Sequence, residues 1–182
     1  IREDLQPQKV ELVVEEDEQS VTVSTAELKW SIDKATFNTH IVNIQGLPVL
    51  EDELGFHWEE NRHAGGNIVI CSKKLNSKEA FYGLGDKPCQ LNLRGRRLQN
   101  YGADTYGYGA DTDPIYKNIP FFIGMHHKAG YGVFLDNSFR TFFDFGSERQ
   151  NVFSFWAQGG EMDYYFIYGP ETMSVAQQYT RL

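Results

Sequence analysis

Acidic and aromatic side chains that could bind a ligand are concentrated between positions 104 and 116. Three aspartates and three tyrosines lie there: Asp104, Tyr106, Tyr108, Asp111, Asp113 and Tyr116. Carboxylates accept hydrogen bonds from hydroxyl groups, and aromatic rings pack against the flat faces of ligands. The pattern therefore favours a loop that contacts a carbohydrate, with a metal site and a loop stabilised by its own turns as alternatives.

The spacing of the acids disfavours a calcium site. Residues 111–116 read DTDPIY, which begins like an EF-hand loop. That loop requires an oxygen ligand at its fifth position and glycine at its sixth, where this sequence has Ile115 and Tyr116. Asp113 followed by Pro114 is instead typical of a turn. The sequence predicts no metal and no cofactor.

Other motifs do not indicate a catalytic centre either. His126 and His127 are adjacent on a predicted strand, so they are expected to point to opposite faces and cannot share a metal ion. Residues 83–88, GLGDKP, lack the third glycine and the Lys-Ser/Thr pair of phosphate-binding loops, and we interpret them as a turn. No GxSxG nucleophile elbow is present in the sequence.

Hydrolysis of a glycosidic bond would require two carboxyl groups that face one sugar ring. Asp104, Asp111 and Asp113 could be arranged in that way, but a loop positions reacting groups poorly unless a rigid scaffold supports it. We therefore expect a loop that contacts a sugar, and no catalytic residue in this chain.

Two-residue alternation dominates the chain and predicts short β-strands. They are expected at 10–16, 20–25, 26–34, 36–50, 68–75, 79–85, 120–127, 131–137, 139–146, 151–158 and 161–169. A hairpin that turns at Arg94-Gly95 is expected over residues 89–100. The polar stretch 51–67, which ends near a Gly-Gly pair, is expected to be a surface loop.

Only the C-terminal stretch 169–182 has a helical period. Val175, Tyr179 and Leu182 lie on one helical face, and Pro170 suits the first helical position. Since no C-cap follows Leu182, we expect the native protein to continue. Many short strands without βα alternation predict an all-β fold, an antiparallel β-sandwich with a short C-terminal helix.

Composition excludes several classes of partner. The chain has 182 residues, which suits one domain or two small ones, and 41% of them are hydrophobic. The net charge of −8 disfavours binding to nucleic acid, and no apolar run approaches the roughly 20 residues of a membrane helix.

Cys71 and Cys89 are interpreted as free thiols, with a disulfide between them as the alternative. The cellular compartment stays open.

Several segments, taken in order, resemble a known enzyme family. They are AFYGLGDKP at 80–88, NYGADTYGYGADTDPIYKNIPFFIG at 100–124, YGVFLDNSFRTFFDFG at 131–146 and MDYYFIYGPETMSVAQQYTRL at 162–182. Together they resemble the N-terminal domain of glycoside hydrolase family 31, which contains α-glucosidases and α-xylosidases. The first 80 residues are similar mainly through their strand pattern and VLEDE at 49–53.

This resemblance implies a fold and a role for the loop. In the family, the domain is a galactose-mutarotase-like β-sandwich that precedes a (β/α)8 barrel, and the barrel hydrolyses α-glycosidic bonds with retention. One loop of the sandwich reaches the mouth of the active site, where an aspartate contacts the sugar. The matching residue is Asp104, and Tyr106 could line the same pocket. Ile119, Phe121 and Phe122 are then expected to anchor the loop by burial.

The sequence lacks the catalytic part of the family. The nucleophile motif Trp-x-x-Asp-Met-Asn is absent, and 182 residues cannot hold a barrel beside this sandwich. We therefore expect residues 1–182 to be a single, non-catalytic N-terminal domain that binds an α-linked glucoside or oligosaccharide at the interface with its own C-terminal barrel. The alternatives are a free-standing carbohydrate-binding module, a purely structural domain and an independent epimerase.

Overall fold

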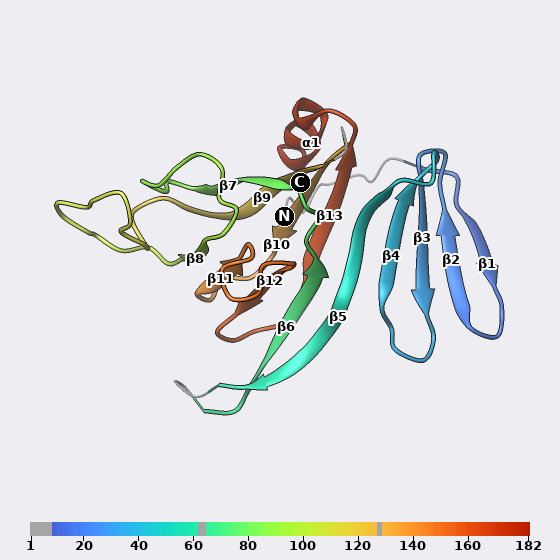
Figure 1. The fold of residues 1–182 in the computed structure, drawn as a ribbon, viewed down its shortest axis with the longest axis horizontal. Coiled ribbons are helices and arrows are strands. Elements are labelled where there is room, and N and C mark those ends of the chain that lie inside the picture. Colours follow the sequence, from blue (N-terminus) through green and yellow to red (C-terminus); the bar gives the residue numbers. More distant parts are fainter. Residues whose placement is uncertain (1–8, 62–64, 127–128) are drawn as a thin grey trace.

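Two packed antiparallel sheets and one helix make up the computed structural model, which describes residues 9–61, 65–126 and 129–182 (Figure 1). Within these ranges the larger sheet has nine strands and the smaller has four. The larger sheet runs, edge to edge, β1 (Val13–Glu16), β2 (Ser20–Ser24), β3 (Leu28–Asp33), β4 (Thr39–Asn43), β5 (Pro48–Glu60), β6 (Asn67–Lys74), β12 (Val152–Ala157), β11 (Thr141–Asp144) and β8 (Arg97–Asn100). The smaller sheet runs β13 (Tyr164–Gly169), β10 (Ala129–Leu135), β9 (Asn118–His126) and β7 (Ala80–Gly85). The predicted antiparallel β-sandwich is confirmed.

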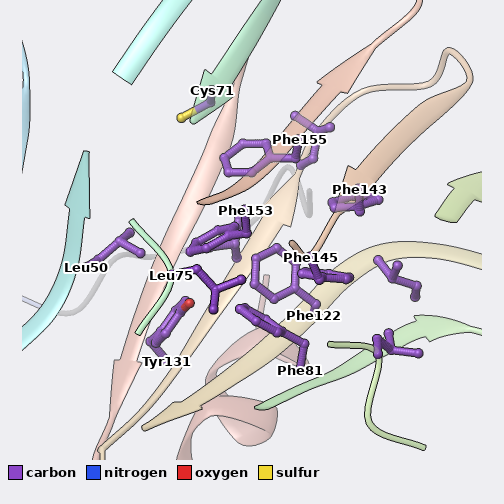
Figure 2. Close-up of a cluster of buried hydrophobic side chains, with 14 of the residues drawn as sticks. Leu50, Cys71, Leu75, Phe81, Phe122, Tyr131, Phe143, Phe145, Phe153 and Phe155 are labelled. Atoms are coloured by element: carbon purple, nitrogen blue, oxygen red, sulfur yellow. The ribbon is translucent and has the colours of Figure 1, made fainter. Parts of the chain in front are cut away.

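Aromatic side chains fill the space between the sheets. Phe153 and its neighbours from both sheets point toward one another in Figure 2. The ring of Phe81 on β7 stacks on that of Phe145 at 4.4 Å between centroids and lies 5.3 Å from that of Phe153. Phe122 on β9 meets Phe145 edge to face at 5.1 Å. This alternation of inward rings explains why the phenylalanine-rich segments form strands.

The predicted surface loop over 51–67 is wrong, because most of it is strand β5. This strand pairs with β4 and β6, with a bulge between Asp52 and Gly55. The stretch lacks a clear two-residue alternation because most of its acids face solvent, a bulge follows Asp52, and Asp52 itself is a buried acid. Its carboxylate pairs with Lys73 and also accepts hydrogen bonds from the amide and hydroxyl of Thr39 at 2.7 and 2.9 Å. An acid buried by a partner on another strand gives no hydrophobic signal in the sequence.

The predicted hairpin over 89–100 is also wrong in its first arm. The turn at Arg94-Gly95 exists, since the amide of Arg96 donates to the carbonyl of Leu93 at 3.1 Å and Gly95 has φ +79°. However, only Arg97–Asn100 is a strand, and it pairs with β11. Leu93 is buried in the core, and its amide donates a hydrogen bond to the carbonyl of Phe81 on β7. The first arm therefore contacts the smaller sheet instead of pairing with the second arm.

Helix α1 (Thr172–Tyr179) packs against β9, β10 and β13, on the face of the smaller sheet that is turned away from the core. Val175 is fully buried, and the ring of Tyr179 stacks on Phe121 of β9 at 3.9 Å. Leu182 packs against the same cluster, so the predicted apolar face is confirmed. Pro170 lies before the helix, because Glu171 is its N-cap. No helix in the described ranges is long and apolar enough to span a membrane.

The two cysteines differ in accessibility, and both are free thiols as predicted. In the folded protein, we expect iodoacetamide to modify Cys89 and to leave Cys71 unmodified. Cys71 is fully buried, and burial raises the pKa of its thiol to about 12, so little reactive thiolate exists at neutral pH. Peptide mass spectrometry with and without denaturant checks this. Equal labelling of both cysteines in the native protein would contradict the placement of Cys71.

Candidate functional site

The acidic and tyrosine-rich segment is a loop that bridges the two sheets. Residues 101–117 leave β8 at the edge of the larger sheet and enter β9 in the smaller one. Figure 1 shows the loop in yellow-green at the far left, projecting beyond both sheets. A segment placed there is supported at its base by two rigid elements while its tip remains available for contact with a ligand.

Three contacts join the outgoing and returning limbs of this loop. The amide of Ala103 donates to the carbonyl of Ile115 at 3.5 Å, and the Thr105 hydroxyl donates to the carbonyl of Pro114 at 3.3 Å. The Tyr116 hydroxyl donates back to the carbonyl of Thr105 at 2.6 Å. The loop is therefore braced on both sides of Asp104.

Burial of apolar side chains adds to this bracing, partly as the sequence predicts. Phe121 and Phe122 are buried as expected, but Ile119 is only partly buried. Ile115, within the loop itself, is 3% exposed and supplies the missing apolar anchor.

The three aspartates of the loop have different environments. Asp113 accepts a hydrogen bond from the Lys87 amine at 2.7 Å and another from the Gln99 amide at 2.6 Å. Asp111 accepts one from the Arg96 guanidinium at 2.9 Å. Among the residues that the structure describes, none forms a hydrogen bond or ion pair with the Asp104 side chain, which is exposed. Asp104 is thus the acid of the three that is free to accept hydrogen bonds from a ligand.

The tyrosines near Asp104 also differ. Tyr106 is 99% exposed, so its whole ring is accessible. Tyr108 lies edge to face against Tyr116 at 6.0 Å between ring centroids, which fixes it beside the braced limbs. Asp104 and Tyr106 are both exposed, and their contact with a sugar stays a prediction.

Metal ligation finds no support in the geometry. The described part of the chain contains no group of three histidine, cysteine, aspartate or glutamate side chains that could hold an ion. Asp111 and Asp113 already pair with cationic side chains. His127 lies outside the described residues, so the expectation for the two adjacent histidines is not tested.

A histidine and a glutamate do approach each other, but in the core. His126 Nε2 lies 3.9 Å from Glu79 Oε1, and it forms a hydrogen bond with the carbonyl of Val49 at 2.8 Å. The Tyr131 hydroxyl donates to Glu79 at 2.6 Å, and burial together with this carboxylate raises the pKa of Tyr131. The side chains of His126 and Glu79 are each 1% exposed. A sugar cannot reach this pair, so it cannot act as the acid and base of an epimerase.

A groove of about 1150 Å³ lies on the outer face of the larger sheet, across β5, β6, β12, β11 and β8. Trp156 lies at its floor but is only 7% exposed. Phe142 stacks beside its ring at 5.2 Å, and the Arg97 guanidinium lies over it at 4.8 Å. On the rim, Arg149 pairs with Glu53 at 2.9 Å. Because these groups already contact one another, the loop is the stronger candidate for a ligand site.

Sequence reasoning missed the residues that support the loop. Lys87, Gln99 and Tyr116 hold its limbs through hydrogen bonds, although Lys87 stood in a motif interpreted only as a turn. No local pattern indicates such contacts, because Lys87 and Asp113 are separated by many residues and meet only in the folded chain.

Comparison with protein families shows what the chain is similar to. Residues 1–144 match the family described as glycosyl hydrolase 31 N-terminal galactose mutarotase-like domain. Among curated proteins, α-glucosidase 2 of Bacillus thermoamyloliquefaciens is 32% identical over 97% of this chain and 22% of its own length. The α-xylosidase XylQ of Lactiplantibacillus pentosus is 29% identical over 94% of this chain and 22% of its own length.

Solved structures give the same result. A GH31 dextranase of Flavobacterium johnsoniae, solved with glucose, has a TM-score of 0.83 and 34% identity, over 92% of this chain and 20% of its own. The cycloalternan-forming enzyme of Listeria monocytogenes, solved with a pentasaccharide substrate, has a TM-score of 0.81 and 26% identity, over 93% of this chain and 16% of its own. The chain spans about a fifth of the length of the curated relatives that match almost all of it.

Proposed function

The chain belongs to the N-terminal galactose mutarotase-like domains of glycoside hydrolase family 31, and on that premise we propose that it serves an α-glucosidase-like enzyme. In this proposal residues 1–182 form a single N-terminal domain, and the residues that break the glycosidic bond lie in a barrel that follows it. The small share of each relative that the chain covers supports this division.

The observation that supports the proposal most strongly is the unpaired carboxylate of Asp104 on a braced part of the loop. Its carboxylate is exposed and has no partner among the described residues, while hydrogen bonds on both sides hold its backbone. Because the backbone at Asp104 is held in this way, binding costs less backbone entropy than it would on an unbraced loop. We propose that Asp104 accepts hydrogen bonds from sugar hydroxyls beside the bond that is cleaved. Tyr106 is the weaker candidate, since its ring is exposed but has no bracing contact of its own.

The proposed ligand is an α-linked glucoside or oligosaccharide. The dextranase structure contains glucose and the structure of the cycloalternan-forming enzyme contains a pentasaccharide substrate, which supports a carbohydrate ligand here. We propose that this ligand lies between the loop and the chain's own barrel, so that neither part alone forms the complete site.

A free-standing carbohydrate-binding module is the rival proposal, and calorimetry separates the two. We expect titration of residues 1–182 with maltose to give little heat, because the loop offers one unpaired carboxylate on an exposed segment, which buries little of a sugar. Binding of maltose by the isolated chain with a saturable isotherm would favour the module and contradict a site completed by the barrel.

Activity of the longer protein tests the proposal itself. We expect the protein that contains this chain and its downstream region to release glucose from an α-linked glucoside, and residues 1–182 alone to release none. Both are assayed with maltose under the same conditions. Release of glucose by residues 1–182 alone, or no release of glucose by the longer protein from any α-linked glucoside, would refute it.

A further inference from the structure

We propose that Lys87 is a positioning residue that fixes Asp104 through the returning limb of the loop. This inference rests on the proposed function of Asp104. It assigns a role to the GLGDKP motif at 83–88, whose interpretation as a simple turn leaves its lysine unexplained.

Lys87 lies at the centre of a buried polar cluster beneath the loop. Its amine donates to Asp113 Oδ1 at 2.7 Å and to the carbonyl of Gln99 at 2.6 Å. The second oxygen of Asp113 accepts the amide of Gln99 at 2.6 Å, and the side-chain amide of Gln99 donates to the carbonyl of Asp113 at 3.2 Å. The side chains of Lys87 and Asp113 are only 3% and 13% exposed. Each charge therefore depends on the other for its compensation.

This cluster is connected to Asp104 through two consecutive carbonyl groups. Pro114 and Ile115 directly follow Asp113, and their carbonyls accept the hydrogen bonds of Thr105 and Ala103. Asp104 lies between those two donors. A shift of Asp113 would move both acceptors, and the two residues that flank Asp104 would lose their partners. Each step from Lys87 to Asp104 is therefore either a hydrogen bond or a peptide bond between consecutive residues.

The glycines of the motif explain why Lys87 reaches this place. Gly85 has φ +81°, and a Cβ atom on it would lie 2.4 Å from the carbonyl oxygen of Lys117 on the returning limb. Only glycine permits this approach of β7 to the limb. The amide of Asp86 then donates to the same carbonyl at 2.9 Å, which places the next residue, Lys87, under the loop.

A double-mutant cycle in the longer enzyme tests the role directly. We expect Lys87→Met, which removes the amine and keeps an unbranched side chain up to the ε-carbon, to lower kcat/KM about tenfold, since a charged hydrogen-bonded partner is lost. In the background of Asp104→Ala the same substitution should cause little further loss, because it acts through Asp104. A double variant whose loss is the product of the two single losses would overturn the proposal.

Lys117→Met is the matched control. The Lys117 amine lies 3.9 Å from Asp86, and its side chain is 66% exposed, so this lysine belongs to the same region but carries an exposed pair. Its kcat/KM should remain close to that of the wild type. If Lys87→Met fails to fold, Asp113→Asn carries the cycle, since an amide cannot accept both hydrogen bonds that the Asp113 carboxylate accepts.

Hydrogen exchange separates a failure of this inference from a failure of the proposed function. We expect Lys87→Met to speed the exchange of the Gln99 and Ala103 amides about tenfold, whether or not Asp104 contacts a sugar. Wild-type kinetics in Asp104→Ala together with faster exchange in Lys87→Met would reject the sugar contact and keep the positioning. Unchanged exchange in Lys87→Met would reject the positioning itself.

Discussion

Replacing Lys73 by alanine is expected to lower the free energy of unfolding by about 3–5 kcal/mol. The side chains of Lys73 and Asp52 are each 1% exposed and form an ion pair between β6 and β5. The Lys73 amine also donates to the Tyr164 hydroxyl of β13 at 3.2 Å, so it links the two sheets. Without the amine, the Asp52 carboxylate would remain buried with only the hydrogen bonds from Thr39.

The neighbouring lysine supplies the control for this experiment. Lys74 pairs with Glu51 on the same two strands, but its side chain is 54% exposed. Lys74→Ala should therefore change the free energy of unfolding by less than about 1 kcal/mol. Urea unfolding of both variants, followed by tryptophan fluorescence, measures the difference. Equal losses of unfolding free energy at the two positions would show that burial of the Lys73–Asp52 pair does not increase its contribution to stability.

The second large effect is expected on catalysis. In the longer enzyme, Asp104→Ala should lower kcat/KM for an α-linked glucoside at least tenfold, because a charged hydrogen bond contributes about 1.5–3 kcal/mol. The loss should occur without a change in the urea midpoint, since the Asp104 side chain has no partner among the described residues. Steady-state kinetics with maltose, together with urea unfolding, measure both quantities.

Asp111 is the matched control for Asp104 on the same loop. It is exposed and acidic, but its carboxylate pairs with Arg96 at 2.9 Å. Asp111→Ala should leave kcat/KM close to the wild-type value, because an exposed ion pair contributes little. Equal losses in Asp104→Ala and Asp111→Ala would indicate that any change of charge on the loop has the same effect, and would remove the specific role of Asp104.

The sequence predicted most strands and the helix because their inward positions are apolar and regularly spaced. Phe153 and Phe155 on β12, or Val175 on α1, carry that signal in the residues themselves. Most of strand β5 was not predicted, because a bulge interrupts its alternation and one of its inward positions is Asp52, which pairs with Lys73 on another strand. A pattern of hydrophobicity cannot register a charge that is compensated by a distant partner.

The same limit applies to the candidate site. The sequence located the acidic and aromatic loop and, through a family resemblance, singled out Asp104. It could not show that Asp111 and Asp113 are held by Arg96 and Lys87, because these pairs form only in the folded chain. The free state of Asp104 and the bracing around it therefore emerged only from the structure.

A crystal structure of the longer enzyme with an uncleaved α-linked glucoside tests the central claim most directly. We expect a carboxylate oxygen of Asp104 about 2.5–3.0 Å from a sugar hydroxyl next to the scissile bond. The reacting carboxyl groups should then come from residues outside positions 1–182. A sugar bound in the active site with Asp104 beyond hydrogen-bond distance, and with no bridging water, would contradict it.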